Sequence, residues 1–384
     1  MKYIILILFI AINSFAQHTL TTSQISGQLN TITTAVPFLL ISPDARAGAM
    51  GDAGCASTPD VYSNYWNAAK NVFAEKEMGV GISYTPWLRA LVPDINLADI
   101  STYKKIGRNN IVSISEKYFS LGDISFTNTV GVTIGQFCPY ESATSICFSR
   151  KLNHNFSVGI ATKYIYSDLT GGKTVMGNKT IPGTSFAGDI SCFWIDTFMV
   201  EEKSSVFAWG INISNVGQKI KYVDTARGDF IPANLRFGIS YKLNINADNS
   251  IELICDANKL LVPTPAPQDT VASWKNKSVA RGMLGSFTDA PDGWKEELHE
   301  INIASGIEYL HAKMLSVRGG YFYEHPTKGG RKYLTLGVGV RYAAFLLDFS
   351  YLIPTMQRHP LQNTLRLSFT CMLNAIKKNL KKRN

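Results

Sequence analysis

The chain has 384 residues, of which 45% are hydrophobic and 11% aromatic but only 17% charged. The charged fraction lies below the roughly 25% of soluble domains, and the mean hydropathy of +0.00 excludes both a bundle of membrane-spanning helices and a disordered chain. Low charge with many aromatic residues is typical of a β-protein whose outer surface meets something other than water. The formal net charge is +9.

The N-terminus predicts export. Lys2 precedes an unbroken apolar run over residues 3–12, and a small-x-small cleavage site ends at Ala16. The alternative, a transmembrane helix, needs about 20 apolar residues, and this run is too short. We therefore interpret residues 1–16 as a signal peptide and expect the mature chain to start at Gln17.

Residues 17–77 show no alternation of the kind that marks strands. The part from 42 to 54 is rich in Gly and Ala, and small residues let a backbone pack closely in a narrow space. We expect an N-terminal extension and an internal hatch or plug, rather than a mobile periplasmic linker, because large aromatic residues indicate packed structure. The candidate hatch residues are Gly48, Met50, Gly51, Gly54, Trp66 and Asn67. The glycine spacing only superficially resembles a phosphate-binding loop, because no P-loop lysine or preceding strand accompanies it.

Residues 78–371 predict a transmembrane antiparallel β-barrel. Segments of about ten residues alternate in polarity and are separated by turn residues, which is the barrel signature. In lipid, only helices and closed barrels satisfy the backbone, and no later segment forms a helix of spanning length. We expect about fourteen strands, at residues 78–86, 109–119, 123–136, 143–151, 155–166, 185–196, 205–214, 233–243, 250–257, 300–310, 313–323, 333–342, 345–352 and 361–371.

The connections favour a membrane barrel over a soluble β-sandwich, which also alternates. From the second predicted strand onward, short links alternate with mostly longer ones, apart from a short link near 137–142. Short turns at one end and long loops at the other are typical of outer-membrane barrels, and Tyr and Trp recur at strand ends as an interfacial girdle requires. An even strand count predicts that both termini face the periplasm and that the long loops are extracellular.

The sequence carries no recognisable catalytic constellation. It lacks a GxSxG elbow and an HExxH motif, and none of the six histidines has a partner at metal-ligand spacing. We therefore expect a non-enzymatic protein without a metal or a cofactor.

The longest predicted loop spans residues 258–299 and is rich in Pro and Trp. The plainest interpretation is a disordered surface loop. However, a long loop on a rigid scaffold is often functional, and exposed apolar side chains often mark an interaction site. We name as candidate partner-contacting residues Pro263, Pro265, Trp274 and Trp294.

Residues 372–384 form a basic tail with five Lys and Arg residues. Such a run can bind nucleic acid or an anionic surface. In an exported chain we favour a solvated periplasmic extension, and we expect no nucleic-acid partner.

Three segments carry a resemblance to a known family. Residues 42–54, 65–70 and 80–89 are similar to the corresponding blocks of the PorV family, the outer-membrane proteins of the type IX secretion system that are related to FadL-type transporters. The resemblance runs from near residue 40 to near residue 370.

The resemblance implies a FadL-like barrel of fourteen strands with an N-terminal hatch. It also implies a role without catalysis, in which the protein binds the C-terminal signal domains of secreted cargo beside the giant translocon barrel. The cargo then passes to a surface sortase complex, which attaches it to lipopolysaccharide. The alternative is a FadL-type channel for small hydrophobic molecules, because the fold alone cannot choose between these functions.

Overall fold

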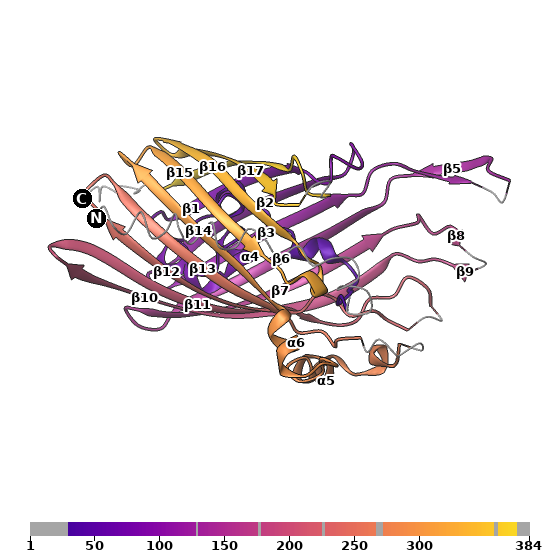
Figure 1. Cartoon of the computed structure of the whole chain (residues 1–384). Coiled ribbons are helices and arrows are strands. Elements are labelled where there is room, and N and C mark those ends of the chain that lie inside the picture. Colours follow the sequence, from indigo (N-terminus) through magenta and orange to yellow (C-terminus); the bar gives the residue numbers. More distant parts are fainter. Residues whose placement is uncertain are drawn as a thin grey trace, which may run out of the picture.

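A computed structural model describes residues 30–127, 130–175, 178–224, 227–265, 272–356 and 360–374. The expected signal peptide and most of the basic tail lie outside these ranges. Fourteen antiparallel strands close into one barrel (Figure 1). The first strand, β1, pairs with the last, β18, and each remaining pair consists of wall strands that follow one another along the chain. The predicted all-β barrel is confirmed. Among the described residues, no helix is long and apolar enough to cross a membrane.

The strands of the barrel wall are β1 (Met78–Pro86), β2 (Asn96–Ile106), β3 (Asn110–Ser120), β6 (Tyr140–Lys151), β7 (Phe156–Asp168), β10 (Gly183–Val200), β11 (Lys203–Gly217), β12 (Asn234–Asn244), β13 (Ser250–Leu260), β14 (Ile301–His311), β15 (Leu315–Tyr323), β16 (Lys332–Tyr342), β17 (Phe345–Pro354) and β18 (Leu365–Leu373). Two small hairpins lie outside the wall, formed by β4 (Ile124–Thr127) with β5 (Thr133–Phe137) and by β8 (Thr174–Val175) with β9 (Asn178–Lys179).

Two sequence-based strand assignments were wrong, and their errors cancel in the count. The predicted strand at 123–136 is the β4–β5 hairpin, which projects from the barrel (Figure 1). The segment assigned to a loop before residue 109 contains β2. Its inward side chains include Leu97 and Tyr103, each 1% exposed. Because apolar residues occupy both faces of β2, the sequence lacks the alternation that marks the other strands.

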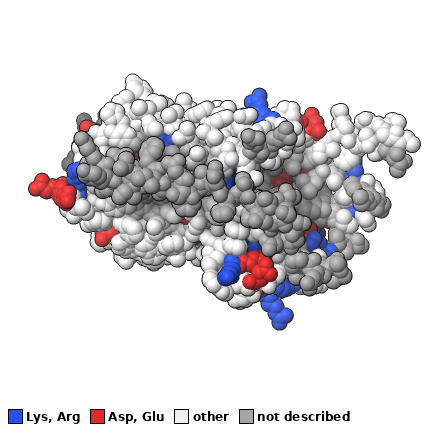
Figure 2. All heavy atoms as spheres, in the orientation of Figure 1, with Lys and Arg blue, Asp and Glu red and all other residues white. Residues whose placement is uncertain are grey.

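Side chains alternate between the two faces of the wall, as β16 illustrates. Tyr333 and Thr335 are buried inside the barrel, whereas Leu334, Leu336 and Val338 point outward and are 46–56% exposed. An apolar outer face is what a lipid environment requires. Figure 2 shows the same division on the white surface above and below the grey atoms, which carries few charged side chains compared with the ends of the molecule.

The two ends of the barrel differ in their connections. At one end, which we call the turn end, links of two to five residues join the strands; at the other, the loop end, the links have eight to 40 residues. With β2 in place the alternation has no exception, because residues 137–142 lie where the β4–β5 hairpin passes into β6 and do not link two wall strands.

Residues 30–77, which we call the inner segment, run through the barrel from the loop end to the turn end. Asn30 donates its backbone N–H to Thr327 in the β15–β16 loop. Val61 and Val72 pack near the β2–β3 turn against Tyr103. Between these points lie four short helical turns: η1 (Pro37–Leu40), α3 (Ala45–Gly48), α4 (Ser63–Trp66) and η2 (Ala68–Phe73).

The inner segment touches the wall with its backbone where the wall has no side chain. A Cβ atom added at Gly320 on β15 would lie 2.1 Å from the Gly51 nitrogen, and one at Gly306 on β14 would lie 2.5 Å from the Met50 Cβ. Gly51 itself has a φ of +72°, a conformation that side chains disfavour. The wall and the inner segment are therefore complementary at the level of the main chain.

The replacement Gly320→Ala tests this close approach. The new methyl group would overlap the backbone of Gly51, so we expect a loss of roughly 1–3 kcal/mol or more in barrel stability, read as a lower unfolding temperature in heat-modifiability gels. The adjacent Gly319→Ala is the matched control, because its Cβ would meet nothing closer than 3.9 Å. Equal unfolding temperatures for the two variants would contradict the proposed contact.

Candidate functional site

The turn that begins α3 is fixed by one carboxylate. Asp44 precedes the helix, and its Oδ2 accepts a hydrogen bond from the Ala47 N–H at 2.8 Å. Its Oδ1 accepts the indole N–H of Trp66, also at 2.8 Å. An Asp at an N-cap satisfies otherwise free helical N–H groups, and here the same side chain also holds Trp66. Two distant parts of the inner segment are thereby joined.

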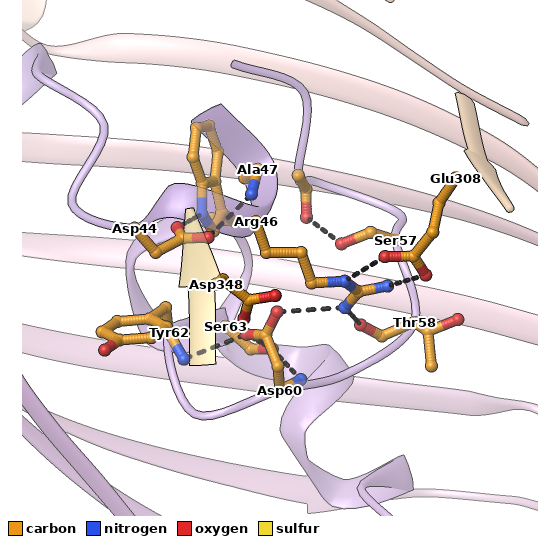
Figure 3. A network of polar contacts seen from close by, with 12 residues as sticks. Asp44, Arg46, Ala47, Ser57, Thr58, Asp60, Tyr62, Ser63, Glu308 and Asp348 are labelled. Carbon is orange, nitrogen blue, oxygen red and sulfur yellow. Dashed lines mark hydrogen bonds and ion pairs between the residues drawn. The ribbon is translucent and has the colours of Figure 1, made fainter. Parts of the chain in front are cut away.

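Arg46, two residues after Asp44, connects the inner segment to the wall (Figure 3). Its Nε and Nη2 each donate to the Glu308 carboxylate at 3.0 Å, and Nη2 also donates to Glu252 at 3.2 Å. Its Nη1 donates to Asp60 at 3.1 Å and to the Thr58 carbonyl at 2.8 Å. The bidentate contact is the strong geometry for a guanidinium and a carboxylate.

The network continues along the wall through a second arginine. Arg318 on β15 donates its Nε to Glu308 at 2.5 Å and its Nη1 to Asp348 on β17 at 2.6 Å. The Arg318 side chain is 2% exposed and Asp348 is 3% exposed. Glu308 thus lies between two arginines. Because every ion here has lost water, removal of a single partner leaves uncompensated charge in the barrel.

Two other carboxylates position the glycine-rich stretch. Asp256 on β13 accepts the backbone N–H groups of Gly54 and Cys55, each at 2.8 Å. In the inner segment, Asp52 contacts Arg366 of β18 at 2.9 Å and accepts the Tyr333 hydroxyl of β16 at 2.6 Å. One carboxylate from the wall, Asp256, and one from the inner segment, Asp52, therefore bridge the wall and the inner segment.

The structure brings the six candidate hatch residues together inside the barrel. Gly48 lies against Arg366, and Gly54 lies against the Trp66 ring, so that a Cβ at either position would clash at 2.3–2.4 Å. Met50 is fully buried. Asn67 caps η2 and donates to the Cys192 carbonyl of β10 at 2.9 Å.

In the long loop between β13 and β14, the described residues 261–265 and 272–300 form a cap at the loop end. It contains η3 (Ser273–Asn276), α5 (Val279–Gly285) and α6 (Trp294–His299). Glu300 is the main anchor: it contacts Lys259 of β13 at 2.6 Å, Lys328 of the β15–β16 loop at 3.0 Å and the Thr264 hydroxyl at 2.6 Å. Lys328 also contacts Glu296 at 2.5 Å. These ion pairs hold the described part of the cap against the wall.

The candidate loop residues occupy different environments. Pro263 is buried and Pro265 is half-buried. Trp274 stacks on Phe230 with ring centroids 6.1 Å apart, which suits a structural role. Trp294, by contrast, is 70% exposed.

Three further apolar side chains of the cap are also exposed. Together with Trp294 they form the group that we call the cap patch: Leu284 (77% exposed), Phe287 (47%), Trp294 (70%) and Leu298 (55%). Among these, Leu284, Phe287 and Leu298 escaped the sequence interpretation. Helical spacing within α5 and α6 was the signal available for Leu284 and Leu298, and the loop was not read as helical. Phe287 lies between the two helices, and its residue type was the only signal for it.

The sequence interpretation also missed the arginine network. The available signal was the presence of Glu252, Glu308, Arg318 and Asp348 on the polar faces of predicted strands, with Arg46 in the expected hatch. Among the described residues, no group of three or more His, Cys, Asp or Glu is placed to hold a metal ion.

Comparison with known proteins decides the family. The family described as type IX secretion system protein PorV matches residues 24–267, more than half of the chain. The chain belongs to the PorV family. Membership makes it a component of the type IX secretion system, and with the closed apolar-faced barrel it indicates the outer membrane as its location. PorV and FadL-like proteins are secretion or transport components. No match was found among curated proteins.

Solved structures include a transporter with a similar barrel fold. The P. putida toluene transporter TodX is 9% identical, with a TM-score of 0.50 over 87% of this chain and 99% of that one. The Ralstonia pickettii toluene transporter TbuX is also 9% identical, with a TM-score of 0.46 over 88% of this chain and all of that one. A Pseudomonas aeruginosa FadL homologue is 10% identical, with a TM-score of 0.43 over 90% and 100%.

The replacement Arg46→Ala tests the network. It leaves Glu252 and Glu308 without their shared partner, and breaking a buried pair costs roughly 3–5 kcal/mol. We expect a lower unfolding temperature and faster proteolysis of the inner segment in detergent. Lys313→Ala is the matched control, because the Lys313–Asp248 pair is more than 60% exposed and such pairs contribute about 0–1 kcal/mol. Equal effects of the two changes would contradict the anchoring role of Arg46.

A pH dependence is expected where the cap meets the β15–β16 loop. The rings of His299 and His325 stack with centroids 3.5 Å apart. Burial lowers the pKa of His325 to about 4, with His299, Lys332 and Lys328 adding repulsion. Because this pKa lies below the ordinary value of 6.5, the folded form binds fewer protons. The stabilisation is therefore complete above pH 6.5 and is lost as the pH falls towards about 4.

Hydrogen–deuterium exchange of residues 290–300, corrected for the intrinsic pH dependence of exchange, measures this effect. We expect faster opening of the cap below about pH 6 in the wild type. His325→Phe keeps a flat ring but cannot titrate, so its opening rate should not change over that range. A wild-type rate that does not depend on pH would contradict the prediction.

Proposed function

We propose that this protein binds the C-terminal signal domains of secreted cargo at the translocon and passes the cargo to the surface attachment complex. In this role the loop end of the barrel is the working surface, and no bond is made or broken by the protein. Its partners are the giant translocon barrel, the cargo signal domains and the sortase complex, in a membrane of lipid and lipopolysaccharide.

The cap patch is the observation that carries the proposal. Four large apolar side chains are exposed on the long β13–β14 loop, although the cap is held firmly by its ion pairs to Lys259 and Lys328. Exposed apolar groups on a fixed support favour contact with another protein. Trp294 is the strongest candidate anchor, because Trp is enriched among the residues that dominate binding.

The lumen supports protein handling over the alternative, a FadL-type channel for small hydrophobic molecules. The inner segment is ion-paired to the wall at two places, Glu308 on β14 and Arg366 on β18. A hydrophobic solute would have to pass buried ionic groups, which is costly without compensation. We infer that residues 30–77 act as a hatch that keeps the barrel closed.

The same barrel suggests an orientation. Outer-membrane barrels place short turns in the periplasm and long loops outside. We propose that the turn end of this barrel faces the periplasm and that the cap lies at the cell surface, where cargo emerges.

The replacement Trp294→Ala tests the cap patch. Because the side chain is exposed, the barrel should keep its unfolding temperature, whereas loss of a central anchor weakens binding by about 2 kcal/mol. We expect roughly tenfold or greater loss of a purified cargo C-terminal domain in a pull-down from mild detergent. Met199→Ala is the matched control, since Met199 is 65% exposed at the turn end.

Two outcomes would contradict the proposal. One is a wild-type protein that captures neither the translocon nor a cargo domain; the other is a Trp294→Ala variant that captures cargo as well as the wild type. Uptake of toluene or fatty acid into liposomes that contain the wild-type barrel would favour the channel instead.

A further inference from the structure

The turn end of the barrel contains a cavity of about 270 Å³. We call it the vestibule. Its floor is the arginine network, with Arg46, Arg318 and Glu308, and its rim is formed by short turns between strands, including Asn244, Asn249 and Ala344. The vestibule is thus separate from the cap, which lies at the other end.

Charged side chains lie on both the floor and the rim of the vestibule. On the floor, the arginines Arg46 and Arg318 are fully engaged with carboxylates. On the rim, Lys313 pairs with Asp248 at 3.4 Å. Three other rim cations have no carboxylate within ion-pair distance among the described residues: Lys76, Lys242 and Arg341. Apart from Asp248, the acidic residue on the rim is Glu75.

Arg341 supplies a second observation. Its Nε is buried and has no hydrogen-bond partner in the described structure. A buried guanidinium N–H without an acceptor costs free energy, and an incoming oxygen would satisfy it. The charge on the rim therefore coincides with an unfilled donor in the vestibule.

The spacing of the rim cations defines the size of the ligand. Lys242 lies on β12 and Arg341 on β16, four strand positions apart, which is roughly 19 Å along the wall at about 4.8 Å per strand. A phosphate or a single carboxylate reaches only donors within about 3 Å. An extended ligand with several carboxylates can contact cations that lie on strands four positions apart.

We propose that the vestibule binds an extended acidic peptide segment of a partner protein, with Lys76, Lys242 and Arg341 as its contacts. Met372 near the end of β18 also lines the vestibule, and the three rim cations give this end of the barrel a positive field. Steering by such a field raises the rate at which acidic partners associate.

Fluorescence anisotropy of a fluorescein-labelled hexaglutamate peptide, with the full-length protein in mild detergent, tests the proposal. We expect saturable binding that weakens with salt and no binding of hexaglutamine. The double variant Lys242→Gln/Arg341→Gln should weaken hexaglutamate binding about tenfold. The matched control is Lys221→Gln/Lys332→Gln, which removes the same charge at the loop end and should bind like the wild type.

Three results would overturn the proposal: no binding of hexaglutamate, equal losses in the two double variants, or displacement of the peptide by inorganic phosphate at equal total charge. The second would indicate a general effect of net charge or of the basic tail, which both variants retain. The third would indicate an anion site at one cation. Heat-modifiability gels confirm that each variant is folded. The result does not depend on cargo binding at the cap, so this proposal and the proposed function fail separately.

Discussion

The guanidinium of Arg46 is the interaction on which the interior depends. A charged group inside a barrel has lost its water, and only several well-placed acceptors offset that cost. Here Glu308, Glu252 and Asp60 supply them, two from the wall and one from the inner segment itself. The inner segment cannot shift along the barrel without separating these charges. The position of the glycine-rich stretch against β14 and β15 follows from this fixed point.

The sequence predicted the wall well because lipid imposes a rule that is local in the chain. Where outward residues are apolar and inward ones polar, as in β16, a strand can be recognised from a few residues. The rule failed for β2, where Leu97 and Tyr103 face an apolar part of the inner segment, and for the β4–β5 hairpin, whose residues lie outside the wall. Both failures depend on what a strand packs against, which is not local information.

The same distinction explains what could be predicted of the interior. The small residues at positions 48, 51 and 54 indicated close packing before any partner was known. The partners themselves were not predictable: Arg46 and Glu308 are 262 residues apart, and nothing in either neighbourhood specifies the other. In the cap, both Trp294 and Trp274 were selected for their residue type. That Trp274 is instead a structural residue could be seen only from the position of Phe230, on which it stacks.

The path of the inner segment has a consequence for assembly. The described chain starts at Asn30 beside the β15–β16 loop, crosses the lumen and continues into β1 at the opposite end. The seam of the barrel is the pairing of its first and last strands, β1 and β18. The inner segment leads directly into β1, one strand of that seam. It must be enclosed while the wall is still an open sheet, because inserting it later would require moving its buried charges through a closed barrel. Pairing of β1 with β18 is therefore the step that fixes the inner segment inside the barrel, and the sheet closes around a segment that is already in place.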